Sequence, residues 1–378
     1  MTISSRKKES VSGVETGVLL FIIMLTFKTC NLPAVLFSEA KESGVWSILF
    51  HLLLDGILLV FALFVASKGG IQSKAIPAPI RKIASALLFL FFLFKFTAFS
   101  FEATTSIVSV LFEQSLIYPI FVAVLISTAF LGGKGFRSVG RTALLLGWLA
   151  ILLLIFNVLF ISFDGFAFNL YPILRFKSVS GGMLKQAIWF GEPLILMTAD
   201  LSPKLDKKQK GFVITSYVLS CVILIGFYLL LIFTYGEIAK SVNNAFSRVL
   251  TMNKFSNQLG SVDWPIIALW LGASIIHLSS MFCASRQCYL EIVNRKMKGK
   301  TAKNVIFYAI MIVVPTLVYT FVFDSISYIK ILTSIPVAVI ALIMCYVLPI
   351  VLAIIIYLKN KEQNQKEDSN AKQETENC

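Results

Sequence analysis

The sequence predicts an all-α integral membrane protein in which ten transmembrane helices form two sets of five, with the first and sixth helices broken. Of the 378 residues, 57% are hydrophobic and only 14% are charged, whereas about a quarter of the residues in a soluble domain are charged. Ten apolar runs approach the length of about 20 residues that a helix needs to cross a bilayer. Ten such runs exclude a soluble domain with a large apolar core.

The ten apolar runs occupy most of the chain between residues 14 and 358. The predicted spans are 14–37, 46–65, 83–101, 116–131, 142–163, 181–201, 211–235, 264–289, 305–323 and 331–358. The third can also continue past Phe101 through Thr104, Thr105 and Ser106. They form one membrane domain, residues 14–358, between an N-terminal tail, 1–13, and a C-terminal tail, 359–378. The C-terminal tail is rich in Lys, Glu, Gln and Asn, and we expect it to be disordered.

The basic residues separate into two groups when the connections between spans are assigned alternately to the two sides of the membrane. With the N-terminus inside, 24 of the 34 Lys and Arg residues lie in inside segments, 7 in outside segments and 3 within spans. Because positive charge stays on the cytoplasmic side, both tails are predicted to be cytoplasmic. The net charge of +14 then reflects topology signals and contacts with anionic lipid headgroups, and nucleic-acid binding is not indicated.

Motifs for catalysis and for metal binding are missing from the sequence. The six cysteines have no zinc or disulfide spacing, and two histidines are too few for a metal site. The chain contains no phosphate-binding loop, no HExxH and no GxSxG. The sequence therefore predicts no enzymatic activity and no cofactor.

Two of the apolar runs contain polar residues and a proline that should interrupt a helix. The first reads Thr26-Phe27-Lys28-Thr29-Cys30-Asn31-Leu32-Pro33, and the sixth reads Trp189-Phe190-Gly191-Glu192-Pro193. Proline removes a backbone donor and clashes with the preceding turn, and broken helices at membrane depth are tolerated where they line a cavity. Each set of five spans opens with a broken run, and because five is odd the second set enters from the opposite side. That pattern is typical of an inverted repeat with a substrate site near the midplane.

Unwound backbone at such breaks offers a specific chemistry. Half-helix N-termini suit a carboxylate and half-helix C-termini suit an ammonium group, so a zwitterionic amino acid matches both. The candidate substrate-binding residues are Thr26, Lys28, Thr29, Asn31, Trp189, Phe190, Gly191 and Glu192.

Four charged residues, Lys28, Asp55, Lys95 and Glu192, fall near the middle of their predicted spans. Uncompensated charge there is costly, so buried ions pair or line water. We expect Asp55 and Glu192 to match the two lysines, with the pairing open. These groups serve either as a substrate or proton site or as structural ion pairs. His51 shares a helix face with Asp55, which allows a proton relay or a packing pair.

Two further features complete the pattern. His277, followed by Ser279 and Ser280, is expected to satisfy a neighbouring helix rather than bind a ligand. The outside connection 236–263 carries apolar Ala245, Val249 and Leu250 among polar residues, which predicts a short amphipathic helix on the outer face.

The layout resembles the spore-germination permease family, the B subunit of endospore germinant receptors, within the amino acid–polyamine–organocation transporter superfamily. The matching residues are Asn169-Leu170-Tyr171-Pro172-Ile173-Leu174, Phe190-Gly191-Glu192, Leu32-Pro33 and the lysine-containing loop 203–211. The resemblance covers about residues 11 to 358.

This resemblance implies a LeuT-like transporter fold of 5+5 inverted repeats. It implies that a germinant, typically an amino acid, binds between the breaks of spans 1 and 6, with spans 3 and 8 lining the pocket. The partners would be an A subunit and a lipoprotein C subunit in the inner membrane of the endospore, which would read the conformational change.

One departure from the family concerns the first break. Many relatives have glycines there, whereas this chain has Lys28-Thr29-Cys30-Asn31. Either Lys28 replaces the usual backbone grip on a carboxylate, or the ligand is not an amino acid. Two other functions stay open: a permease coupled to H⁺ or Na⁺, and a structural membrane subunit with a vestigial pocket.

Overall fold

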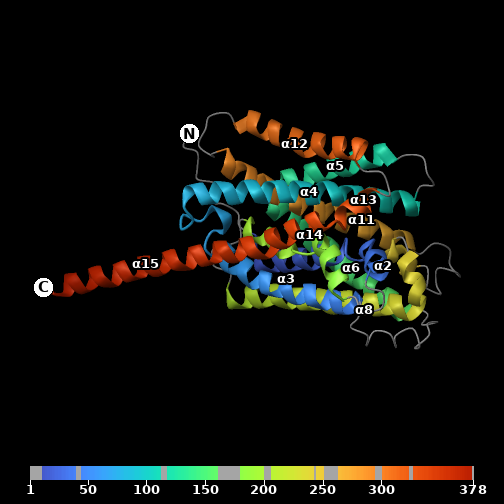
Figure 1. Ribbon diagram of the computed structural model, residues 1–378, viewed down its shortest axis with the longest axis horizontal. Helices are drawn as coiled ribbons and strands as arrows, with labels where there is room; N and C mark the ends of the chain where they lie inside the picture. Colours follow the sequence, from blue (N-terminus) through green and yellow to red (C-terminus); the bar gives the residue numbers. More distant parts are fainter. Residues whose placement is uncertain are drawn as a thin grey trace.

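A computed structural model describes residues 11–39, 44–111, 117–160, 179–199, 206–241, 244–250, 263–293, 300–322 and 327–376. Long helices run side by side through the bundle, and the last helix extends well beyond it (Figure 1). The first predicted set of five spans contains α1 (Gly13–Leu25), α2 (Leu32–Glu39), α3 (Gly44–Ser67), η2 (Gly70–Gln72), α4 (Ala78–Leu111), α5 (Ile117–Gly133) and α6 (Phe136–Phe160).

The second predicted set opens with short helices and then returns to long ones. It contains α7 (Val179–Lys185), η4 (Ala187–Trp189), η5 (Glu192–Met197), α8 (Lys207–Tyr235), η6 (Gly236–Ser241), α9 (Ala245–Leu250), α11 (Asp263–Ile292), α12 (Lys300–Phe321), α13 (Ser327–Leu332), α14 (Ile335–Leu342), the π-helical η7 (Ile343–Val347) and α15 (Leu348–Glu376). The short helix predicted in the connection 236–263 is confirmed as α9.

The described residues include six helices that are long and apolar enough to cross a membrane, and seven if the bent pair α5 and α6 counts as one span. Their outward side chains are apolar: Leu53, Leu90, Leu145 and Trp148 are each at least 60% exposed. Water would not favour such a surface, whereas a bilayer does. The chain is a multi-pass membrane protein.

Both predicted breaks are present. The first span begins with a capping box, in which the Ser12 hydroxyl accepts from the Glu15 N–H and the Glu15 carboxylate accepts from the Ser12 N–H. It is interrupted between α1 and α2, and Pro33 lies at the second position of α2, where its missing N–H costs nothing. The sixth span is interrupted at Phe190 and Gly191, and η5 then continues as a 3₁₀-helix.

The breaks lie among continuous helices. Helix α4 packs along α11, and α1 packs against α8 and α6. Helix α4 runs from Ala78 to Leu111, so it extends beyond the predicted span 83–101 and carries Glu102 into the bundle. This extension matters for the site described below.

The C-terminal segment differs from its expected disorder, because α15 continues as a helix to Glu376 and projects from the bundle (Figure 1). Lys, Glu, Gln and Ala favour helix over other conformations. Glu362 and Lys366 also have the i, i+4 spacing that supports an exposed helix.

Candidate functional site

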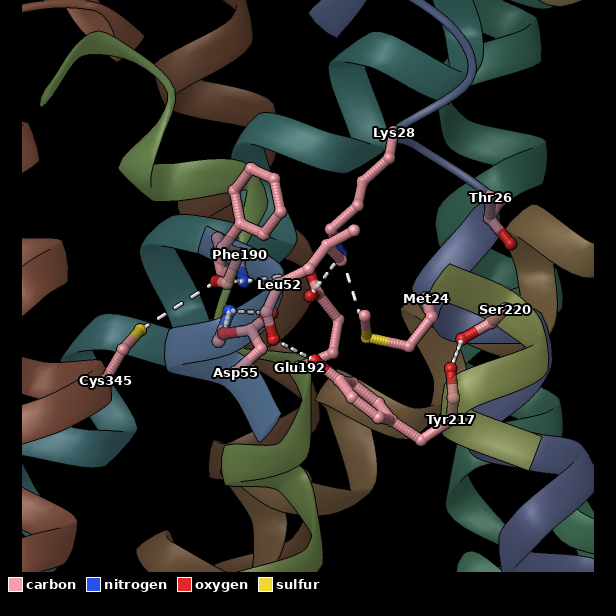
Figure 2. Close-up of polar contacts among 12 residues, drawn as sticks. Met24, Thr26, Lys28, Leu52, Asp55, Phe190, Glu192, Tyr217, Ser220 and Cys345 are labelled. Atoms are coloured by element: carbon pink, nitrogen blue, oxygen red, sulfur yellow. Dashed lines mark hydrogen bonds and ion pairs between the residues drawn. The ribbon is translucent and has the colours of Figure 1, made fainter. Parts of the chain in front are cut away.

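The two breaks meet through an ion pair between Lys28 and Glu192. The Lys28 ammonium group contacts Glu192 Oε2, and both side chains are 1% exposed. Figure 2 shows Lys28 reaching across from the first break toward Glu192. Lys95, from α4, donates to Glu192 Oε1 at 3.3 Å and to the Phe190 carbonyl at 2.7 Å. One carboxylate therefore receives both lysines that the sequence placed at mid-membrane.

Asp55 has a different role from the one expected. Among the described residues it forms no ion pair with either lysine. Its two oxygens accept from the Gly191 N–H at 2.9 and 3.2 Å, and Oδ1 also accepts from the Tyr346 hydroxyl at 3.0 Å. Gly191 has φ +88°, in the left-handed region, so its N–H leaves the helical pattern and needs another acceptor. Asp55 supplies that acceptor.

His51 also binds elsewhere than the predicted pairing with Asp55. Its Nε2 lies 2.6 Å from the Met183 carbonyl, and its ring stacks on Phe190 with centroids 4.5 Å apart. The shared helix face was a correct inference from spacing, but the backbone of span 6 supplies a nearer partner for each side chain. A direct His51–Asp55 relay is not formed.

The backbone carbonyls freed at the first break are occupied by protein donors. The Trp270 indole N–H donates to the Thr26 carbonyl at 3.2 Å, and the Tyr228 hydroxyl donates to the Lys28 carbonyl at 3.0 Å. The Ala245 N–H, at the start of α9, donates to the Cys30 carbonyl at 3.1 Å. These partners stabilise the unwound segment as the structure describes it.

The threonines of this break bind their own helix turn. The Thr26 hydroxyl donates to the Ile22 carbonyl at 2.7 Å, and the Thr29 hydroxyl donates to the Leu25 carbonyl at 3.2 Å. Such back-bonding bends helices. Both residues therefore shape the break, in addition to lining it.

Glu102 is a functional candidate that sequence reasoning missed. It is fully buried and accepts from the Asn31 N–H at 3.3 Å, the Trp189 indole N–H at 3.2 Å and the Tyr328 hydroxyl at 3.1 Å. It thus joins both breaks to α13. The predicted third span ended at Phe101, one residue before it. The run of small polar residues Thr104, Thr105 and Ser106 did indicate that this helix can continue past Phe101, but Glu102 itself was not singled out.

His277 differs from its expected role as a partner for a neighbouring helix. It is 1% exposed, and neither ring nitrogen has a hydrogen-bond partner among the described residues. Its ring lies against Phe27 and Phe99, with centroids 4.9 and 5.7 Å away. Ser279, by contrast, does bond a neighbouring helix, at the Thr128 carbonyl.

The candidate site is closed in this structure, because Lys28, Trp189, Phe190 and Glu192 are all almost completely buried. A groove of about 430 Å³ lies elsewhere, between α5 and α12. It is lined by Ile126, Ala129, Phe130, Gly133, Lys134, Tyr308 and Ile312. Within the described part of the chain, no group of three His, Cys, Asp or Glu side chains is placed to hold a metal ion.

No protein-family model and no curated protein matches the chain. Solved structures do match it. A Na⁺-coupled sialic acid symporter, in a substrate-bound outward-open state, aligns with a TM-score of 0.57 at 14% identity, over 89% of this chain and 79% of that one. A manganese transporter of Eremococcus coleocola aligns with a TM-score of 0.50 at 10% identity, over 95% of this chain and 90% of that one. The predicted LeuT-like transporter fold is thereby confirmed.

Proposed function

We propose that the chain binds a small organic ligand, an amino acid in the simplest case, between its two broken spans. The observation that carries this proposal is the Lys28–Glu192 contact, which joins the two breaks through charged side chains at 1% exposure. The proposed binding residues are those of the two breaks: Thr26, Lys28, Thr29, Asn31, Trp189, Phe190, Gly191 and Glu192.

A purely structural role explains this cluster less well. Replacing a buried ion pair by apolar residues of similar volume is often neutral or stabilising, so stability alone does not require these charges. Ionisable side chains inside a membrane bundle are typical of substrate and ion pathways. Here they occur at the two points where the helices are interrupted, and unwound backbone at membrane depth favours a binding site.

The role that we propose for this binding is that of the membrane subunit of a spore germinant receptor. The support is the resemblance of Asn169–Leu174, Phe190–Glu192 and the surrounding layout to that family. In this role the ligand would bind one conformation of the chain more tightly and so increase its population. An A subunit and a lipoprotein C subunit in the endospore inner membrane would detect this change in population. No transport step is needed.

The second candidate is a permease for amino acids or organic cations coupled to H⁺ or Na⁺. The observation that favours it is the fold likeness to transporters. The two candidates predict different results. A permease moves radiolabelled ligand into proteoliposomes, whereas a receptor subunit co-purifies with A and C subunits and accumulates no ligand.

The binding proposal is tested by the thermal stability of the purified full chain across a panel of amino acids, nucleosides and monovalent cations. A ligand present at 100 times its dissociation constant adds about 2.7 kcal/mol to the free energy of unfolding. We expect an amino acid to stabilise the wild type and Lys134→Met, which lies in the distant groove, but not Lys28→Met. Equal stabilisation of Lys28→Met would place the ligand elsewhere.

A further inference from the structure

The charged groups in direct contact at the breaks are unequal in number. Two ammonium groups, Lys28 and Lys95, converge on the single carboxylate of Glu192, and each takes a different oxygen. Asp55 is occupied by the Gly191 N–H and the Tyr346 hydroxyl. One lysine can therefore turn away without leaving Glu192 as an unpaired buried charge.

Both ammonium groups also have supports other than Glu192. Lys28 Nζ lies 5.0 Å from the centre of the Phe190 ring, and Lys95 Nζ lies 5.5 Å from that of Phe99. Lys95 additionally donates to the Phe190 carbonyl. Aromatic faces attract cations, so these groups hold the lysines near their positions when a different carboxylate arrives.

A third polar group, His277, packs on the Phe99 ring that Lys95 also faces, and its hydrogen-bonding capacity is unused among the described residues. His277 is buried, and both of its nitrogens lack a partner among the residues described. It packs on Phe27, which precedes Lys28 in the chain, and on Phe99, one helical turn after Lys95. A buried imidazole without partners is costly, and a ligand that bonds to it removes that cost.

We propose that Lys28, Lys95 and His277 form a carboxylate receptor, and that Glu192 is its resident carboxylate in this structure. This inference rests on the proposed function and names the chemical class of its ligand. The ligand's carboxylate takes Lys28, Glu192 stays with Lys95, and His277 supplies a further hydrogen bond. The carboxylate is the essential group of the ligand, and its amine is not.

The charge count explains why a carboxylate is selected over an amine. A ligand ammonium group would compete with two lysines for one carboxylate and would bring a third cation into a buried site. A ligand carboxylate instead pairs with one lysine and leaves Glu192 to the other, so that each lysine has its own carboxylate partner. Charge-assisted bonds of this kind are among the stronger hydrogen bonds in proteins.

The test compares matched probes that differ only in their charged groups. Alanine, leucine and phenylalanine are each compared with the carboxamide, which lacks the carboxylate, and with the deaminated acid, which lacks the amine. Thermal stability of the full chain gives an apparent dissociation constant for each probe. We expect amino acids and deaminated acids to bind and the carboxamides to bind at least about tenfold more weakly.

The outcomes separate this inference from the proposed function. Carboxamides that bind as tightly as the amino acids would overturn the carboxylate receptor and leave the ligand site in place. If no probe of any kind stabilises the protein, both the proposed amino-acid site and the carboxylate receptor formed by Lys28, Lys95 and His277 are disproved.

Substitutions at Glu192 and at Lys28 should change the affinity for a carboxylate in opposite directions. Glu192→Gln removes the resident carboxylate. Propionate, the deaminated acid that matches alanine, should therefore stabilise this variant more than the wild type. Lys28→Met should lose about tenfold or more in carboxylate affinity, Lys28→Arg should retain it, and Lys134→Met should match the wild type. Weaker propionate binding to Glu192→Gln would overturn the inference. Should that variant fail to fold, the Lys28 variants decide the question, because in them Glu192 remains paired with Lys95.

Discussion

At the scale of single residues, Gly191 determines how the sixth span is interrupted. Its φ of +88° is a conformation that other residues rarely adopt. A Cβ atom added there would overlap with the Cys345 side chain. Figure 2 shows the Cys345 thiol directed at the Phe190 carbonyl, the residue before Gly191. The glycine is thus required twice, for its dihedral angle and for its lack of a side chain.

Gly191→Ala should therefore lower the free energy of unfolding by roughly 2–5 kcal/mol, the sum of left-handed strain and overpacking. Gly135→Ala is the matched control, because Gly135 has φ +93° and an added Cβ there meets no described atom within 4 Å. It should cost only about 1–2 kcal/mol. Denaturation of the purified variants measures both, and equal losses would show that the contact with Cys345 is unimportant.

At the scale of elements, continuous helices hold the broken ones in place. Glu102, on α4, binds one donor from the first break, one from the sixth span and one from α13. The three donors come from segments far apart in the sequence, and all meet the same buried carboxylate. Its loss would leave several buried donors without an acceptor, which is more costly than the net value of the bonds themselves.

We expect Glu102→Ala to lower stability by about 3 kcal/mol or more, because three buried donors lose their acceptor. Tyr328→Phe removes one of these donors and should cost about 1 kcal/mol. Glu362→Ala, on the exposed part of α15, is the control and should have almost no effect. Thermal unfolding in detergent gives the three values. A loss for Glu102→Ala no larger than that for Tyr328→Phe would contradict the network.

At the scale of the whole molecule, the bundle presents apolar side chains outward and encloses five charged side chains. Lys28, Asp55, Lys95, Glu102 and Glu192 are all buried, whereas the exposed positions of the long helices carry Leu, Ile, Val and Phe. A bilayer is the solvent that this arrangement suits. The orientation of the bundle in that bilayer then depends on the basic residues of its connections.

The bias of 24 basic residues to 7 predicts that both tails face the cytoplasm. Alkaline phosphatase fused after residue 378 should be inactive, and green fluorescent protein fused there should fluoresce. Phosphatase fused within the connection 236–263 should be active. The reverse pattern would invert the topology, although it would leave the fold unchanged.

Much of this organisation could be predicted from the sequence, because it depends on local composition and spacing. Apolar run length predicted the six long apolar helices found among the described residues. Lys28, Pro33, Gly191 and Glu192 revealed both breaks, because charged residues, glycine and proline are unfavourable within a lipid-facing helix. Counting residues along each span predicted that Lys95 and Asp55 lie deep within their helices, and both side chains are buried.

Only the tertiary structure decided which of these charges meet. The Lys28–Glu192 and Lys95–Glu192 contacts join residues 164 and 97 positions apart. Sequence spacing determines how deep a side chain lies in the membrane, but the direction in which it points depends on how its helix is rotated against its neighbours. That rotation follows from packing over the whole bundle. It is why Asp55 caps Gly191, why Glu102 joins the breaks, and why the His277 ring has no hydrogen-bond partner among the residues that the structure describes.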